Sequence, residues 1–136
     1  MTPKEMKDRT ALFARRVIEF STPLFDRAAT KSIGDQLLRS GTAVDANYGS
    51  AQCARSGGEF VSRLGLAVDD VNEAKGWIGL IRDSGLVADS EELQWLAIES
   101  LELTKILVSS YGTAKRNEER RKRIEAAKRK RGKADR

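Results

Sequence analysis

Apolar residues recur along most of this chain at alternating intervals of three and four positions, the spacing of one face of an α-helix. The longest series forms a heptad stripe made up of Phe60, Leu64, Ala67, Val71, Ala74, Ile78 and Ile81. Ser56 precedes this stripe and Glu59 follows three positions later, which predicts a capping box at the start of the helix. Gly85 predicts its end, because glycine readily adopts the left-handed conformation that closes a helix.

The N-terminal segment has the features of another amphipathic helix. Thr2, Pro3 and Glu5 supply an N-cap, a first-turn proline and a capping-box acid. Pro23 is expected to end or bend this helix. Its inner stripe is predicted to be Phe13, Val17 and Phe20.

A second helix is expected to begin at Thr30 or Ser32. Its apolar side consists of Ile33, Leu37, Val44, Tyr48 and Ala51. Three glycines, Gly34, Gly41 and Gly49, each cost a helix about 1 kcal/mol relative to alanine. Three glycines destabilise one helix, and glycine has no Cβ atom. We therefore expect another backbone to approach this helix closely.

Asp89, with Glu92 three residues later, predicts the start of a fourth helix. Its stripe is Leu93, Leu96, Ser100, Leu103, Leu107 and Ser110. No segment alternates apolar and polar residues for long enough to predict a strand. The pattern therefore predicts an all-α protein: an antiparallel up-and-down four-helix bundle in residues 1–114, followed by a basic tail in residues 115–136 that is either a helical extension or disordered.

Positive charge is concentrated in that tail. Residues 115–136 carry twelve Lys or Arg and four acids, a net +8, whereas residues 1–114 carry thirteen and sixteen, a net −3, which together give the +5 of the whole chain. Such a cluster attracts polyanions by releasing their counterions. The predicted nucleic-acid contacts are Lys115, Arg116, Arg120, Arg121, Lys122, Arg123, Lys128, Arg129, Lys130 and Arg131.

These cations are expected to hold phosphates with little base readout, because no aromatic residue is interleaved with them to stack on bases. An alternative is that Glu118, Glu119 and Glu125 pair with them along a helix. In that case the remaining charges are solvated and the tail only makes the protein more soluble.

Several kinds of chemistry are disfavoured by composition. The chain has no histidine and one cysteine, Cys53, which predicts no enzyme activity, no cofactor and no metal site. The carboxylates Asp69, Asp70 and Glu73, with Asp45 and Asn47 as spatial partners, are better explained as a charged outer face or an ion pair between subunits. No apolar run is long enough to span a bilayer and no signal peptide opens the chain, so we expect a soluble, cytoplasmic protein without membrane contact.

Two further sets of residues suggest contacts within or between subunits. Gln36, Arg39, Ser40 and Asn47 are polar residues of the second helix, where they either fix register through buried hydrogen bonds or are simply exposed. Trp77 and Trp95 fall outside the inner stripes of their helices. An aromatic second face is rarely left in water by a monomer, which predicts an oligomer.

Part of the sequence resembles a known family signature. The residues concerned are Gln36-Leu37-Leu38-Arg39-Ser40-Gly41-Thr42, Val44, Ala46-Asn47-Tyr48, Arg55-Ser56, Glu59-Phe60 and Leu64. They are similar to the small four-helix-bundle proteins encoded in intervening sequences of bacterial large-subunit ribosomal RNA, whose relatives serve as accessory proteins of diversity-generating retroelements. The resemblance covers roughly residues 13–117, including Trp77 and the ending at residues 113–117.

This resemblance implies a ring-like homopentamer with a central channel. Tyr48 is predicted, with the polar residues of the second helix and the two tryptophans, to make structural or subunit contacts. It also implies binding of structured RNA or DNA through a basic surface and, for the retroelement relatives, binding of a reverse transcriptase. The favoured prediction is a non-enzymatic, homo-oligomeric bundle that binds nucleic acid, structured RNA first, electrostatically. The alternative is an assembly or adaptor protein that binds a protein partner.

Overall fold

The computed structural model describes residues 1–135, and Arg136, the last residue of the predicted tail, lies outside them. Within this range the chain is all-α and contains no strand. Four α-helices and one short 3-10 helix follow one another: α1 (Pro3–Ser21), η1 (Thr22–Asp26), α2 (Ala28–Gln52), α3 (Gly57–Ser84) and α4 (Glu91–Ala134).

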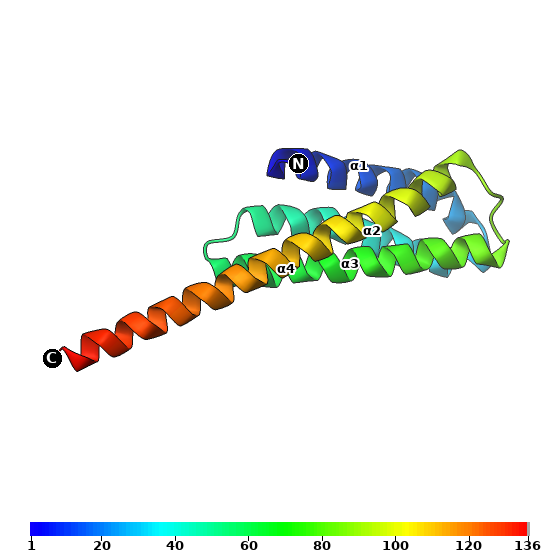
Figure 1. The fold of residues 1–136 in the computed structure, drawn as a ribbon. Coiled ribbons are helices and arrows are strands. Elements are labelled where there is room, and N and C mark those ends of the chain that lie inside the picture. Colours follow the sequence, from blue (N-terminus) through cyan, green and yellow to red (C-terminus); the bar gives the residue numbers. More distant parts are fainter. Residues whose placement is uncertain (136) are drawn as a thin grey trace.

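Each α-helix packs antiparallel against its neighbours in the sequence, and α1 also packs against α4 (Figure 1). The result is the predicted up-and-down four-helix bundle. The fourth helix has 44 residues, against 19 in α1. It therefore continues beyond the end of the bundle at which α1 begins and α2 turns into α3 (Figure 1).

The predicted stripes form most of the core. Buried residues that were predicted to face inward are Phe13, Val17, Phe20, Leu37, Val44, Tyr48, Ala51, Leu64, Ala67, Val71, Ala74, Ile78, Ile81, Leu93, Leu96, Ser100, Leu103 and Leu107. Ile33 and Phe60 are only partly buried, and Ser110 is exposed, because these positions lie at the edges of their stripes. The stripe positions thus predicted which side of each helix packs inward.

Helix starts agree with the sequence at α1 and in part at α3. Thr2 and Glu5 form the predicted capping box. Ser56 caps α3 by accepting a hydrogen bond from the backbone N–H of Glu59 at 3.1 Å. The carboxylate of Glu59 accepts instead from the backbone N–H of Arg55, at 3.4 Å, and from the side chain of Arg63. The reciprocal half of the predicted box is therefore absent at α3.

The predicted start of α2 was wrong. The helix begins at Ala28, before Thr30 and Ser32, because the backbone carbonyl of Arg27 already accepts from the backbone N–H groups of Thr30 and Lys31. The buried hydroxyl of Thr30 donates to the carbonyl of Leu24 at 2.7 Å. Thr30 therefore fastens α2 to η1 and does not cap the helix.

The predicted cap of α4 was displaced by one residue. Ser90, not Asp89, is the N-cap and accepts from the backbone N–H of Leu93 at 3.1 Å. Asp89 accepts from the side-chain amide of Gln94 at 3.2 Å. The end of α3 was predicted correctly, since Gly85 has a φ of 70°.

The glycines of α2 allow the close approach that their number suggested. A Cβ atom on Gly41 would fall 2.7 and 2.8 Å from the methyl carbons of Val17 on α1. A Cβ atom on Gly34 would lie 2.9 Å from the Cβ of Leu24 in η1. Both glycines are therefore required by contact with the N-terminal segment.

Candidate nucleic-acid interface

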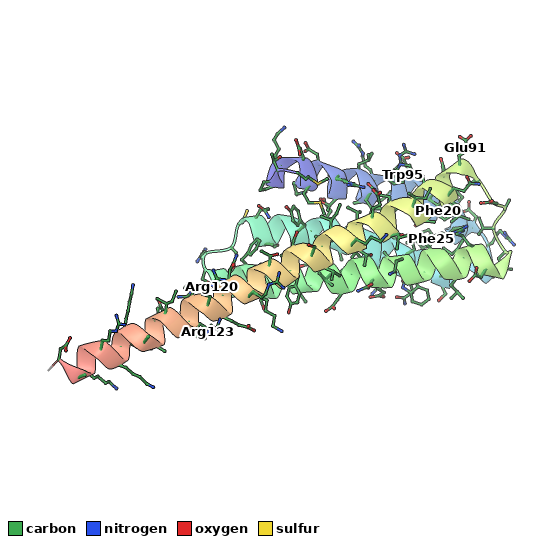
Figure 2. The ribbon with its side chains drawn as sticks, in the orientation of Figure 1. Phe20, Phe25, Glu91, Trp95, Arg120 and Arg123 are labelled. Carbon is green, nitrogen blue, oxygen red and sulfur yellow. The ribbon has the colours of Figure 1, made fainter. Side chains whose placement is uncertain are left out.

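The basic segment is the free end of α4. All residues from 119 to 135 are exposed, so this part of the helix projects into solvent without support from the bundle. Figure 2 shows Arg120 and Arg123 on the projecting part. At about 1.5 Å per residue, the helix extends roughly 24 Å from Glu118 to its end.

Glu118 is the last buried residue of α4 and lies against the first turn of α3. Its side chain is 10% exposed, and a Cβ atom added to Gly57 would overlap its carboxylate. The carboxylate accepts from Nε and Nη2 of Arg121 at 3.1 and 2.7 Å. A carboxylate at this place also faces the positive end of α3. The contact joins the last packed turn of α4 to the start of α3.

Arg121 is paired twice, because its guanidinium also lies 2.9 Å from the carboxylate of Glu125. The hydrogen bond with Arg121 holds the pKa of Glu118 below its ordinary value, and Glu118 in turn raises the pKa of Arg121. Among the predicted cations that the structure describes, the other nine form no ion pair within the helix. The expected pairing of the tail charges is therefore restricted to one arginine.

Cations cover the projecting helix unevenly. Helical spacing places several cations and no acid on the side of the helix opposite Leu107 and Glu118. These cations are Arg116, just before Glu118, and Arg120, Arg123, Lys130 and Arg131 beyond it. The last two turns, residues 126–134, carry five cations and no acid. Successive residues there are about 100° apart, so the charges surround the helix axis.

The polar residues of α2 have different environments. Arg39 is exposed and pairs with Asp35 at 3.2 Å, so it makes no buried hydrogen bond within the subunit, and its expected subunit contact stays a prediction. Ser40 is buried and donates to the carbonyl of Gln36 at 2.9 Å. Asn47 donates to Oδ2 of Asp70 on α3 at 2.6 Å, which confirms that these two residues are neighbours in space.

Burial raises the pKa of Asp70, against the opposing effect of the hydrogen bond from Asn47. Asp69 and Glu73 raise it further through their negative charges. In the described part of the chain, no group of three or more His, Cys, Asp or Glu is arranged to hold a metal ion. Asp70 therefore contributes to the contact between α2 and α3.

The two tryptophans are half-buried and partly covered by neighbouring side chains of the same chain. Trp77 donates from Nε1 to Glu73 at 3.2 Å, and the guanidinium of Arg16 lies 4.8 Å from the ring centre of Trp95. The large apolar side chains exposed on α3 and α4 are aliphatic instead: Leu66, Leu80, Ile98, Leu101, Val108 and Ile124. Their positions outside the inner stripes are the sequence signal of these exposed side chains, which were not among the predicted contacts.

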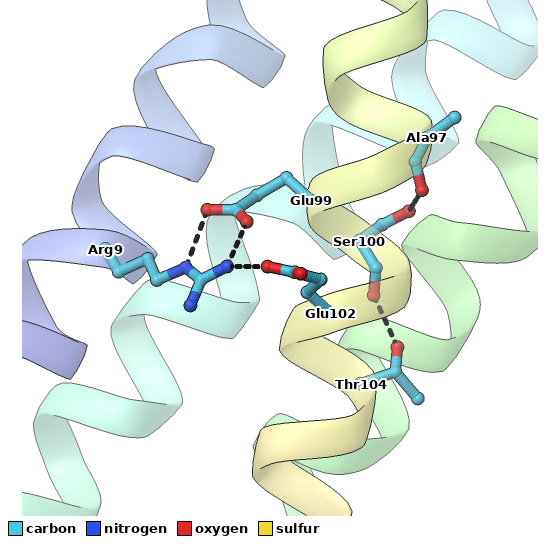
Figure 3. Close-up of polar contacts among 6 residues, drawn as sticks. All are labelled: Arg9, Ala97, Glu99, Ser100, Glu102 and Thr104. Carbon is cyan, nitrogen blue, oxygen red and sulfur yellow. Dashed lines mark hydrogen bonds and ion pairs between the residues drawn. The ribbon is translucent and has the colours of Figure 1, made fainter. Parts of the chain in front are cut away.

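Polar contacts between α1 and the other helices of the bundle were also not predicted from the sequence. Arg9 on α1 donates from Nε to Oε2 of Glu99 at 2.9 Å and from Nη2 to Oε1 at 2.6 Å (Figure 3). The same guanidinium contacts the carboxylate of Glu102. On the other side of α1, Lys7 pairs with Asp45 of α2 at 2.6 Å. No local pattern in the sequence connects these charges.

Across residues 1–135, none of the helices has the length and hydropathy needed to cross a bilayer.

Comparisons with known proteins support the fold. No family model and no curated protein matches the chain. The structure is similar to the crystal structure of a protein of unknown function from the S23 ribosomal protein family of Bacteroides thetaiotaomicron VPI-5482, with a TM-score of 0.74 and 28% sequence identity. The match covers 82% of this chain and 99% of that chain. It is consistent with the four-helix bundle seen here.

Proposed function

We propose that this protein is a non-enzymatic, homo-oligomeric helical bundle that binds nucleic acid through the projecting end of α4. The observation that supports this function is the accumulation of nine predicted cations without ion-pair partners, seven of them on the projecting part of α4 beyond Glu118. The bundle itself carries a net charge of −3 in residues 1–114, so it offers phosphates no comparable attraction. The resemblance in residues 13–117 favours structured RNA as the first ligand to test.

Binding would depend mainly on the release of counterions from the phosphate backbone. If six to ten cations meet phosphates, affinity falls by about three to five orders of magnitude between roughly 50 and 200 mM salt. The projecting helix has no aromatic side chain with which to stack on bases. The expected binding is therefore strong at low salt and weakly dependent on sequence.

Assembly would strengthen this attraction. The exposed side chains of Leu66, Leu80 and Val108 favour burial against another subunit. The homopentamer implied by the resemblance is cyclic, and a cyclic ring presents equivalent helices on one side. Several α4 ends could then engage one polyanion, and the combined affinity would exceed that of a single helix.

The experiment is a titration of fluorescent hairpin RNA and duplex DNA at about 50 and 200 mM salt. Full-length protein is compared with a chain ending at Ala114 and with a full-length variant in which four distal cations become Gln. Those cations are Lys128, Arg129, Lys130 and Arg131. The matched control replaces four exposed cations of the body by Gln: Arg15, Lys31, Arg82 and Lys105.

We expect binding that is sensitive to salt. The truncation at Ala114 should abolish it, the distal substitutions should weaken it, and the body control should leave it unchanged. Equal loss in the body control would contradict a role for α4. Circular dichroism and sedimentation of the same variants separate a binding defect from a loss of folding or assembly.

The exposed aliphatic surface favours a second candidate function. In this alternative the bundle is an adaptor that binds a protein partner, of which a reverse transcriptase is the example implied by the resemblance. Leu101 and Val108 on α4 and Leu66 on α3, each about half exposed, would lie within such a contact. A monodisperse monomer in sedimentation experiments would argue against both an assembled ring and a large apolar interface.

A further inference from the structure

We infer that the preferred ligand of the projecting helix is B-form duplex DNA, with the last two turns of α4 in the major groove. This inference rests on the proposed function and names its ligand from the shape and charge of residues 119–134 alone. It differs from the structured RNA expected from the resemblance, and the two ligands can be compared directly.

The shape of the element favours a wide groove. Residues 119–134 form one α-helix without neighbours, and a helix with side chains is about 10 to 12 Å across. The major groove of B-form DNA is about 12 Å wide and admits a helix. The corresponding groove of A-form RNA is deep and narrow, so it excludes one. A projecting helix therefore distinguishes the two duplexes by fit.

The distribution of charge favours a position between two phosphate backbones. A helix that follows a single strand needs cations on one side only. Here Lys128, Arg129, Lys130, Arg131 and Lys133 point in all directions around the axis, without an acid among them. Such a helix places cations toward both walls of a groove, and each can meet a phosphate.

The remaining residues of these turns are small. Apart from its cations, the segment 126–134 contains only Ala126, Ala127, Gly132 and Ala134. Small side chains allow the helix backbone to approach the floor of a groove. Ile124 is the last large apolar residue, so the segment lacks the apolar face with which a helix would enter an anionic membrane.

The helix is in place before it binds, which lowers the cost of ordering. It continues α4, so no nucleation is required. Arg121 pairs with Glu118 at 2.7 Å and with Glu125 at 2.9 Å, which supports the helix at the base of the segment. Cations near the C-terminus also complement the helix dipole. Basic-region helices likewise continue from a folded dimer into the major groove.

The test measures fluorescence anisotropy of full-length protein with duplex DNA, duplex RNA and single-stranded DNA, all of about 20 residues or base pairs and the same sequence, at about 100 mM salt. We expect duplex DNA to bind at least about tenfold more tightly than duplex RNA. Methyl green, which occupies the major groove, should displace the protein, whereas the minor-groove ligand netropsin should not.

The substitution A127P interrupts the helix while keeping every charge. It should lower affinity for duplex DNA by about tenfold and change single-strand affinity little, since single strands need only the charges. A127S is the matched control at the same exposed position and should behave as wild type.

Equal affinity for the DNA and RNA duplexes, or displacement by netropsin and not by methyl green, would overturn the inference. Salt-sensitive binding in that case would still agree with the proposed function. Failure to bind any of the three probes when the same measurement is repeated at about 50 mM salt would contradict both the inference and the proposed function.

Discussion

Arg9 and Glu99 are 90 positions apart in the sequence and form a two-point hydrogen bond that joins α1 to α4 (Figure 3). The bond with Glu99 raises the pKa of Arg9, so the guanidinium remains charged wherever the protein is folded. Glu99 is only 9% exposed. Its charge is therefore stabilised by Arg9 more than by water.

Removing the arginine should be costly. In the variant Arg9→Met, the carboxylate of Glu99 stays buried beside Glu102 without its partner. We expect the free energy of unfolding in urea to fall by about 2 kcal/mol, the scale of a charged hydrogen bond. Arg39→Met is the control, because the exposed pair of Arg39 with Asp35 should contribute less than about 0.5 kcal/mol. Similar losses in the two variants would contradict the role assigned to Arg9.

Two glycines provide a matched test of packing. In Gly41→Ala, the new methyl group meets Val17, and we expect a loss of about 1 to 3 kcal/mol. In Gly76→Ala the added Cβ meets no atom within 4 Å, so the higher helix propensity of alanine should stabilise by about 0.5 to 1 kcal/mol. Thermal and urea unfolding measure both. Opposite signs are expected, and a stabilised Gly41→Ala would show that α1 does not approach α2 as described.

These glycines show which parts of the fold could be predicted from the sequence and which could not. Periodicity and caps predicted four helices and the residues on their inner faces, because burial requires one continuous stripe on each helix. The number of glycines predicted a close approach to α2. It did not predict that Gly41 faces Val17, since that pairing depends on the rotation of two helices about their axes.

Two carboxylates should make the free energy of unfolding depend on pH in opposite directions. Burial raises the pKa of Asp70, so ionising it opposes folding, and this cost develops as pH rises above the ordinary Asp value of about 3.9. The variant Asp70→Asn cannot ionise. Its stability relative to wild type should therefore increase between about pH 3 and pH 7.

The pKa of Glu118 is lowered by Arg121, so its ionised form favours folding. That contribution is present above the ordinary Glu value of about 4.3 and is lost as pH falls through the lower folded value. Glu118→Gln should accordingly be less stable than wild type at neutral pH and approach it in acid. Urea titrations across this range compare the three proteins. Equal slopes for both variants would contradict the two assignments.

Truncation should show where the contact of α4 with the bundle ends. A chain ending at Lys122 keeps the contact of Glu118 with Gly57 and the bond to Arg121, so its thermal midpoint should match the full-length protein. A chain ending at Ala114 loses that contact and should melt a few degrees lower. Equal midpoints for the two truncations would mean that Glu118 does not secure α4 to α3.

The candidate interface was predicted only in part. Composition identified the cations of the tail, because an excess of like charge is visible in any sequence. It left open whether the tail is helical, which decides whether Lys128 and Lys130 point in different directions. The contact of Glu118 with Gly57 had no sequence signal, since it joins residues 61 positions apart whose types are common on surfaces.

α4 runs without interruption from the bundle to its tip. Because a single helix joins the packed residues to the tip, it acts as a lever whose pivot is Glu118. Over an arm of roughly 24 Å, a tilt of about 10° at the pivot displaces the tip by about 4 Å. Substitutions at Gly57, which lies beside the pivot and not at the tip, would then shift the position of Lys133 without changing a single charge.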